Sequence, residues 1–193
     1  TEYSYSYLVE GEEKINKTFV YYDPPNHDLQ KSNIVLYKTI DGNFTELKYF
    51  VISAPGDIEL DKNYSYVDGD DPNIDESNGI TISKSSITID GKNNYIDAQH
   101  KSRIFTVEGN SVILKNIKFL NADHSAVYVS GQNCLIDNCT FENNSNAVSL
   151  GGAVYWYGDN GKIINSNFNN NSIRSVDDRV YGGAIFWRGN NGN

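Results

Sequence analysis

The sequence predicts an all-β fold: short strands stacked coil upon coil as a parallel β-helix, with one capping helix near the N-terminal end. Two observations lead to this prediction. The phrase GGAVYWYG, which begins at Gly151, returns as GGAIFWRG at Gly182. Within such phrases Val, Ile, Tyr and Phe alternate with polar residues over four or five positions, which is typical of strands. A unit this short cannot bury its apolar side alone, so the copies are expected to stack as a solenoid.

Four copies of the repeat can be aligned, and the last of them is incomplete. Each opens with a strand-like stretch that closes on a glycine, and the complete copies continue to an Asn-x-x-Phe stretch. The stretches are Ile104–Gly109 with Asn116–Phe119, Ala126–Gly131 with Asn138–Phe141, Ala153–Gly158 with Asn165–Phe168, and Ala184–Gly189. The closing glycine and the Phe always lie 10 residues apart, whereas successive glycines lie 22, 27 and 31 residues apart. The core of each coil is therefore fixed, while the connection between coils varies.

The chain divides into three parts. Residues 1–43 contain alternating tyrosines and a later apolar run, which predict a small β segment near the cap. Residues 44–56 carry apolar side chains at helical spacing, preceded by the possible capping pair Asn43 and Glu46 and ended by a Pro-Gly pair. A helix here would cover the open end of the solenoid, which exposes core and strand edges. Residues 57–193 are the predicted coils.

Aligning the copies predicts four columns of inward-facing side chains. They are Phe105, Val127, Val154 and Ile185; Val107, Val129, Trp156 and Trp187; Leu114, Ile136 and Ile163; and Phe119, Phe141 and Phe168. Earlier, less regular coils are expected at Ile58–Leu60, Tyr64–Tyr66, Gly79–Ile82, Ile87–Gly91 and Tyr95–Asp97. Each coil would pair with the next by main-chain hydrogen bonds.

Two further sets of residues align at the predicted corners. Asn116, Asn138 and Asn165 form a column where asparagine tolerates a left-handed backbone and its amides can stack in a hydrogen-bonded ladder. Cys134 and Cys139 align with apolar positions of the preceding copy, which predicts buried free thiols. A local disulfide across the turn is the alternative.

Composition narrows the possible partners. The formal net charge of −9 argues against nucleic acid or an anionic membrane as partner, because both attract clustered Lys and Arg. No apolar run approaches the roughly 20 residues of a membrane span. Asn-x-Ser/Thr sequons are compatible with an extracellular location; they begin at Asn16, Asn43, Asn63, Asn138, Asn143 and Asn170.

Catalysis is one possible function, because parallel β-helices host lyases and glycoside hydrolases. A hydrolase needs paired carboxylates, and a lyase needs a base beside Ca²⁺. Asp177 and Asp178 form an acidic pair between Arg174 and Arg179, either a solvated loop or a catalytic one. The acidic stretch 68–76 is rich in oxygen ligands but lacks the spacing of a calcium loop, so we expect a solvated acidic loop, with calcium binding as the alternative. We expect no enzyme activity, cofactor or metal.

A second polar cluster is expected at a coil corner. If the alignment holds, Asp123 and His124 lie near Lys101 and Arg103 of the preceding coil. This group could bind an anion or supply a base, and a plain surface turn is the alternative.

The strand residues that alternate with the inward-facing ones define a candidate binding face. Thr106, Tyr128, Tyr155 and Phe186 are expected to face outward, with Glu108, Ser130, Tyr157 and Arg188 two positions further on. Aromatic rings about 4.8 Å apart on neighbouring strands would make a flat platform for sugar rings or for a protein partner. Alternatively, these rings pack beneath the loops.

Two long connections, Asn144–Leu150 and Ile173–Val180, fall at the same corner and would flank this face. The candidate ligand-binding residues are therefore Tyr128, Tyr155, Tyr157, Phe186, Arg188, Asp177 and Asp178.

The capping helix followed by GDIEL, GITISKSSITIDGKNNYIDA, SRIFTVEGNSVILKNIKF and GGAVYWYGDNGKIINSNF resembles the adhesin-like surface proteins of methanogenic archaea. Their GGA-type repeats are similar to those of polymorphic outer-membrane proteins and of the pectate-lyase-like group. The resemblance covers about residues 44–193 and implies a right-handed parallel β-helix at the surface of a cell. It also implies that further coils follow in the natural chain.

The expected function is that of a non-catalytic adhesin fragment, extracellular and at the cell surface. Its partner would be the surface of another cell, a protein or a polysaccharide. Two alternatives stay open: a polysaccharide lyase or hydrolase, and a structural stalk that presents a distal binding domain.

Overall fold

The computed structural model describes residues 14–16, 19–22, 29–32, 35–37, 41–71, 73–146, 150–174 and 181–193. The chain forms two compact units, Thr1–Ile40 and Asp41–Asn193. In the first, β1 (Lys14–Asn16) pairs with β4 (Val35–Tyr37) and β2 (Phe19–Tyr22) pairs with β3 (Leu29–Ser32), both antiparallel. The second unit begins before the helix because Gly42 already pairs with Tyr64 of the first coil.

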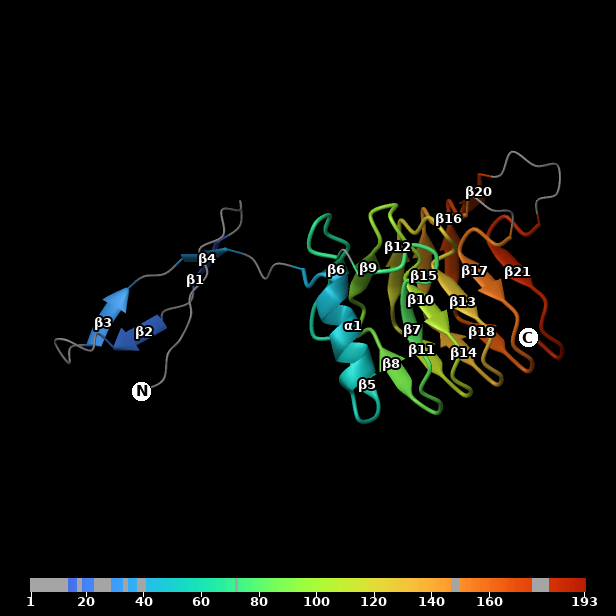
Figure 1. The fold of residues 1–193 in the computed structure, drawn as a ribbon, viewed down its shortest axis with the longest axis horizontal. Coiled ribbons are helices and arrows are strands. Elements are labelled where there is room, and N and C mark those ends of the chain that lie inside the picture. Colours follow the sequence, from blue (N-terminus) through green and yellow to red (C-terminus); the bar gives the residue numbers. More distant parts are fainter. Residues whose placement is uncertain are drawn as a thin grey trace. The chain divides into compact units, whose positions relative to one another are not determined.

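The second unit is a parallel β-solenoid made of three five-stranded sheets, as the sequence predicts (Figure 1). The first sheet contains β7 (Ile80–Ile82), β10 (Phe105–Val107), β13 (Val127–Val129), β17 (Val154–Trp156) and β21 (Ile185–Trp187). The second contains β5 (Ile58–Glu59), β8 (Thr88–Asp90), β11 (Ile113–Lys115), β14 (Leu135–Asp137) and β18 (Lys162–Ile164). The third contains β6 (Tyr64–Ser65), β9 (Tyr95–Asp97), β12 (Lys118–Leu120), β15 (Thr140–Glu142) and β19 (Asn167–Asn169).

The strand register confirms the four predicted inward columns. Val127 pairs with Phe105 on one side and with Val154 on the other, so equivalent residues of successive coils lie directly above one another. The aromatic members of these columns stack face to face: the planes of Phe141 and Phe168 differ by 1°, with ring centroids 4.8 Å apart. The core is thus a set of continuous stacks that run along the solenoid.

The corners between sheets are built from left-handed residues. The predicted column Asn116, Asn138 and Asn165 has φ values of 55°, 50° and 52°. Its ladder differs from the expected run of amide-to-amide bonds. Asn138 Nδ2 donates to Asn116 Oδ1 at 2.8 Å, but the amides of Asn116 and Asn165 donate to carboxylates of the preceding coils, Asp90 and Asp137. The column therefore alternates amide and carboxylate acceptors.

Two other left-handed columns were not predicted. One lies between the first and second sheets and the other follows the third sheet. The first column consists of Ser111, Asn133, Asn160 and Asn191. The second consists of Asn121, Asn143 and Asn170.

The closing glycine of each repeat is required by backbone contact between coils. A Cβ on Gly131 would lie 2.0 Å from the carbonyl oxygen of Gly109, and one on Gly158 or Gly189 would lie 1.9 Å from that of the preceding glycine. No side chain fits at such distances, which explains the glycine at this position in every copy.

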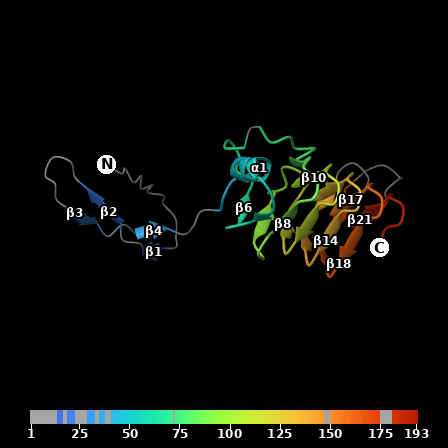
Figure 2. The same cartoon turned by 90° about the horizontal axis from the view of Figure 1, so that it is seen from below.

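Helix α1 (Phe44–Ser53) covers one end of the coil stack (Figures 1 and 2). Phe44, Leu47 and Val51 are buried in the core, as their helical spacing predicts. Asn43 Oδ1 accepts the backbone N–H of Glu46 at 2.8 Å, which is half of the predicted capping pair. The Glu46 carboxylate instead pairs with Lys62 at 2.9 Å. The helix ends at Ser53 because Ala54, which precedes a proline, is extended.

Cys134 and Cys139 are free and buried, in agreement with the predicted thiols and against the local disulfide. Burial raises the pKa of both thiols, that of Cys139 to about 12. Among the described residues, no helix is long and apolar enough to cross a membrane.

Candidate functional site

The predicted aromatic column lies on the outer side of the first sheet. Tyr128, Tyr155 and Phe186 occupy equivalent positions of β13, β17 and β21. The ring centroids of Tyr128 and Tyr155 are 5.0 Å apart with planes at 63°, and those of Tyr155 and Phe186 are 5.3 Å apart with planes at 70°. The rings thus meet edge to face, so they form a corrugated surface and not the flat platform that was expected.

Tyr181 extends this column in a way that sequence reasoning missed. Its ring centroid lies 6.2 Å from that of Phe186, and 53% of its surface is exposed. A parallel bridge between Leu150 and Tyr181 holds this position, where the chain returns from the second long connection. The signal was present in the sequence, since Tyr181 directly precedes the GGA phrase.

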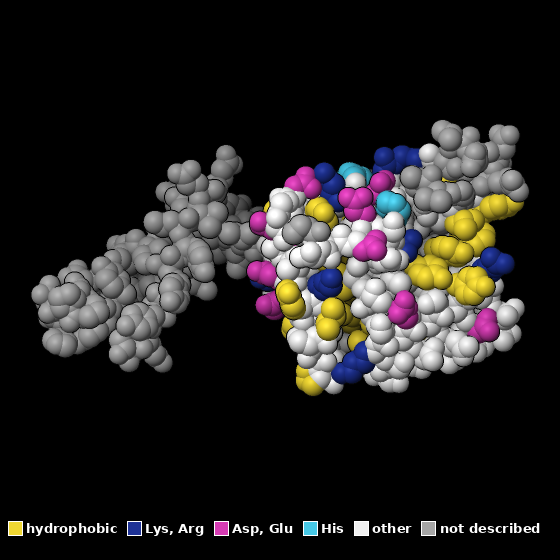
Figure 3. Space-filling view, viewed as in Figure 1, with side chains coloured by type: hydrophobic (Ala, Val, Ile, Leu, Met, Phe, Trp, Pro, Cys, Tyr) yellow, Lys and Arg dark blue, Asp and Glu magenta, His cyan; other side chains and the backbone are white. Residues whose placement is uncertain are grey.

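We name these residues, together with Tyr157, the aromatic surface: Tyr128, Tyr155, Tyr157, Tyr181 and Phe186. Hydrophobic side chains gather over β13, β17 and β21, and Lys or Arg side chains border them (Figure 3). Tyr157 is 47% exposed, whereas Tyr128, Tyr155 and Phe186 are half-buried by their neighbours. Several rings are thus accessible to a ligand, while contacts with neighbouring side chains hold them in place.

Arg188 lies beside the aromatic surface, as predicted. Its guanidinium carbon is 5.4 Å from the ring centroid of Tyr157, close enough for a cation–π contact, and the side chain is exposed. Asp177 and Asp178, the remaining predicted members, lie outside the described residues, so their place relative to this surface stays a prediction.

Arg103 lies at the opposite end of the column, another residue absent from the predicted binding set. Its guanidinium carbon is 5.3 Å from the ring centroid of Tyr128. Its Nε donates to the carbonyl oxygen of His124 at 2.8 Å, and one terminal nitrogen makes a long 3.5 Å contact with Thr106 Oγ1. Thr106 shares the predicted outward position with Tyr128, but it is covered: it is buried and donates to the carbonyl oxygen of Asn78.

The predicted cluster at the coil corner forms in part. Arg103 and His124 are neighbours, but Lys101 pairs with Asp68 at 2.9 Å. Asp123 accepts from Arg174 at 3.1 Å, so this ion pair spans two coils and ties the start of the second long connection to the corner. His124 Nδ1 is buried and has no hydrogen-bond partner among the described residues.

The described ends of those connections form a small extra sheet. β16 (Ser145–Asn146) pairs in parallel with β20 (Ser172–Ile173). Both long connections therefore leave the solenoid side by side at one corner, as the sequence predicts.

Other polar groups have structural roles. The acidic stretch 68–76 contributes Asp71, whose buried carboxylate accepts the first backbone N–H groups of α1 from Phe44 and Thr45 at 3.1 and 2.6 Å. This carboxylate satisfies helix N–H groups that would otherwise lack partners. Within the described parts of the chain, no group of three or more His, Cys, Asp or Glu residues could hold a metal ion.

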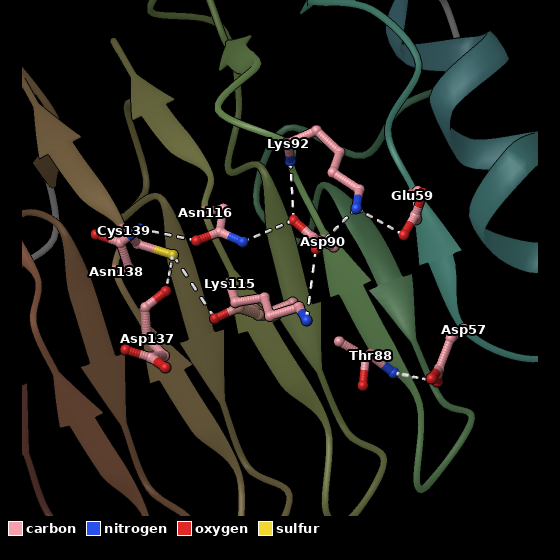
Figure 4. A network of polar contacts seen from close by, with 11 residues as sticks. Asp57, Glu59, Thr88, Asp90, Lys92, Lys115, Asn116, Asp137, Asn138 and Cys139 are labelled. Atoms are coloured by element: carbon pink, nitrogen blue, oxygen red, sulfur yellow. Dashed lines mark hydrogen bonds and ion pairs between the residues drawn. The ribbon is translucent and has the colours of Figure 1, made fainter.

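A second network lies around the ends of β8 and β11 in the second sheet, whereas the aromatic surface belongs to the first (Figure 4). Asp90 accepts from Asn116 at 2.8 Å and lies 3.5 and 3.4 Å from the amines of Lys92 and Lys115. Burial raises the pKa of Asp90, but these hydrogen bonds and positive charges outweigh it and hold the pKa at about 2. The network joins three consecutive coils: Lys92 also pairs with Glu59 at 2.7 Å.

Comparison with known proteins gave no assignment. No family model, no curated protein and no solved structure matches the chain.

Proposed function

We propose that this chain is a non-catalytic adhesin module at a cell surface, and that its aromatic surface attaches to glycans of another cell or matrix. The observation that carries the proposal is the continuous contact from Tyr128 through Tyr155 and Phe186 to Tyr181 on one outer face. The resemblance to adhesin-like surface proteins of methanogenic archaea supports the same proposal.

Aromatic rings suit this role for a physical reason. The apolar faces of sugar rings pack on Tyr and Phe, while phenol hydroxyls and arginine supply hydrogen bonds at the rim. Backbone pairing between coils fixes the strands that carry these rings, so the rings need little reordering when a ligand binds. Strand-borne side chains are also held more firmly than those of a loop.

The proposal is tested by comparing the protein with a triple variant, Tyr128→Ala, Tyr155→Ala and Phe186→Ala. Binding of labelled protein to whole microbial cells and to a panel of neutral and acidic polysaccharides is measured. Tyr49→Ala serves as the matched control, since Tyr49 is 71% exposed on α1, away from the first sheet's outer column. Near-ultraviolet circular dichroism and thermal unfolding show whether each variant is folded.

Saturable binding that the triple variant loses and Tyr49→Ala retains is the expected result. Equal binding by all three proteins would contradict the placement on the aromatic surface. Absence of binding to every cell and polysaccharide would contradict the adhesin proposal and favour a structural stalk.

A further inference from the structure

We propose that the glycan bound by the aromatic surface ends in one acidic sugar, whose carboxylate is held by Arg103 at the Tyr128 end of the column. This inference rests on the proposed function and specifies its ligand. It follows from the charge, the burial and the unused donors of Arg103.

Within the part of the chain that the structure describes, the charge of Arg103 has no direct counter-ion. No carboxylate oxygen of the described residues lies within the 4.0 Å of an ion pair from its guanidinium. The negative charge of Asp75 stabilises the charged guanidinium from a longer distance. Its carboxylate oxygens, however, already accept hydrogen bonds from Ser77 and Asn78. In a protein of net charge −9, this largely buried arginine thus has no carboxylate contact from any residue that the structure describes.

The environment of Arg103 makes such a contact favourable. Burial lowers the pKa of its guanidinium to about 10, and the neighbouring Tyr128 and Asp75 offset only part of that effect. A partly buried cation without a counter-ion is costly, so an incoming carboxylate regains much of the lost solvation. The group remains charged at neutral pH.

Arg103 also has donors available in the right geometry. Nε is engaged by the carbonyl of His124, one terminal nitrogen makes only the long contact with Thr106, and the other has no acceptor among the described residues. The two terminal nitrogens of a guanidinium form a fork that fits the two oxygens of a carboxylate. The ring of Tyr128 lies against the same guanidinium, so a sugar packed on that ring would bring its acid group to the fork.

A single acidic sugar is favoured over a chain that carries a carboxylate on every ring. In the register of the first sheet, the positions equivalent to Arg103 in the next coils are Ser125, Gly152 and Gly183. None of these carries a positive charge, and the hydroxyl of Ser125 is buried and donates to the carbonyl oxygen of Gly151. Glu108 directly follows β10, at the opposite end of that strand from Arg103, and its carboxylate would repel a second carboxylate of the ligand. The aromatic positions beyond Tyr128 therefore suit neutral sugar rings.

Arg188 also lies against a tyrosine ring, but it is exposed to water, where the attraction between opposite charges is weakened by solvent and salt. The control is therefore Lys118, an exposed cation on β12 of the third sheet and outside the aromatic surface. Replacing Lys118 is expected to leave the preference for an acidic ligand unchanged.

The test uses the whole chain and pairs of oligosaccharides that differ only in a terminal acid. The probes are lacto-N-neotetraose, its forms capped with sialic acid or with glucuronic acid, the methyl esters of the capped forms, and polygalacturonate. Affinities are measured by isothermal titration calorimetry for the wild type, Arg103→Gln, Arg103→Lys and Lys118→Gln.

A capped form is expected to bind about tenfold or more tightly than the neutral parent, since charge-assisted hydrogen bonds are among the strong ones. Arg103→Gln should remove this preference, Arg103→Lys should restore part of it, and Lys118→Gln should retain it. Esterifying the acid on the ligand should reproduce the loss with the protein unaltered, so the inference stays testable if Arg103→Gln does not fold.

Equal binding of neutral, esterified and acidic forms by the wild type would overturn this inference and leave the proposed function in place. Preference for polygalacturonate over both capped forms would also overturn it, since that polymer carries an acid on every ring. Failure of the wild type to bind any of the oligosaccharides or polysaccharides would count against the proposed function itself.

Discussion

The rings of Phe119 and Phe141 stack with their centroids 4.8 Å apart and their planes within 15° of one another. Phe168 stacks on the other face of Phe141, so this ring is enclosed within its column. Phe141→Ala should therefore leave a cavity and lower the free energy of unfolding by about 3–5 kcal/mol, as measured by urea denaturation. Phe168→Ala, at a half-buried position, should cost less. Equal losses for both variants would contradict the enclosed stack.

The glycine column predicts a sharp contrast between two substitutions. Gly158→Ala places a Cβ 1.9 Å from the carbonyl oxygen of Gly131, so the coils must separate locally, at a cost of about 1–3 kcal/mol or more. Gly183→Ala is the control because nothing lies within 4 Å of its added Cβ. Thermal unfolding should show a lower transition temperature for the first variant alone. A native-like transition for Gly158→Ala would mean that the coils are not in backbone contact there.

The Asp90 network predicts a loss of stability in acid. The native pKa of Asp90, about 2, lies below the value near 3.9 of an unfolded chain, so the unfolded state binds the proton more readily. The stabilisation is therefore fully present above about pH 4 and is lost as the pH falls toward 2. Unfolding free energies across this range should fall less steeply for Asp90→Asn than for the wild type. Parallel pH profiles would contradict this assignment.

The two thiols should react slowly in the folded protein. Both are buried, and burial raises the pKa of Cys139 to about 12, so little thiolate is present at neutral pH. Labelling with a thiol reagent, followed by mass spectrometry, should give almost no product in native protein and two labels after denaturation. Rapid native labelling at Cys139 would show that this corner opens.

Much of the fold could be predicted because the repeat itself carries the register. Once Phe105 is aligned with Val127, backbone pairing fixes every inward position of the coil, including Trp156. The helix could be predicted for a local reason, since Asn43 and the spacing of its apolar residues lie within one short stretch.

The candidate site was harder to predict because it depends on contacts between coils. The tilt between Tyr128 and Tyr155 arises from how neighbouring side chains pack, which alternation within one strand does not encode. Arg103 precedes its strand, and the alignment predicts it only as a neighbour of His124. Its guanidinium nevertheless lies over the ring of Tyr128 in the next coil. Asp71 caps the helix from a stretch whose composition predicts only a solvated acidic loop.

The central claim is that the outer column of the first sheet binds the ligand, and the most direct measurement is a map of backbone amide shifts during titration. Isotope-labelled protein is titrated with the tightest-binding oligosaccharide of the panel, and the amide shifts are followed by nuclear magnetic resonance. The account predicts saturable shifts concentrated on β13, β17 and β21, together with Arg103 and Tyr181. Shifts concentrated on the second or third sheet, or on residues 1–40, would contradict it.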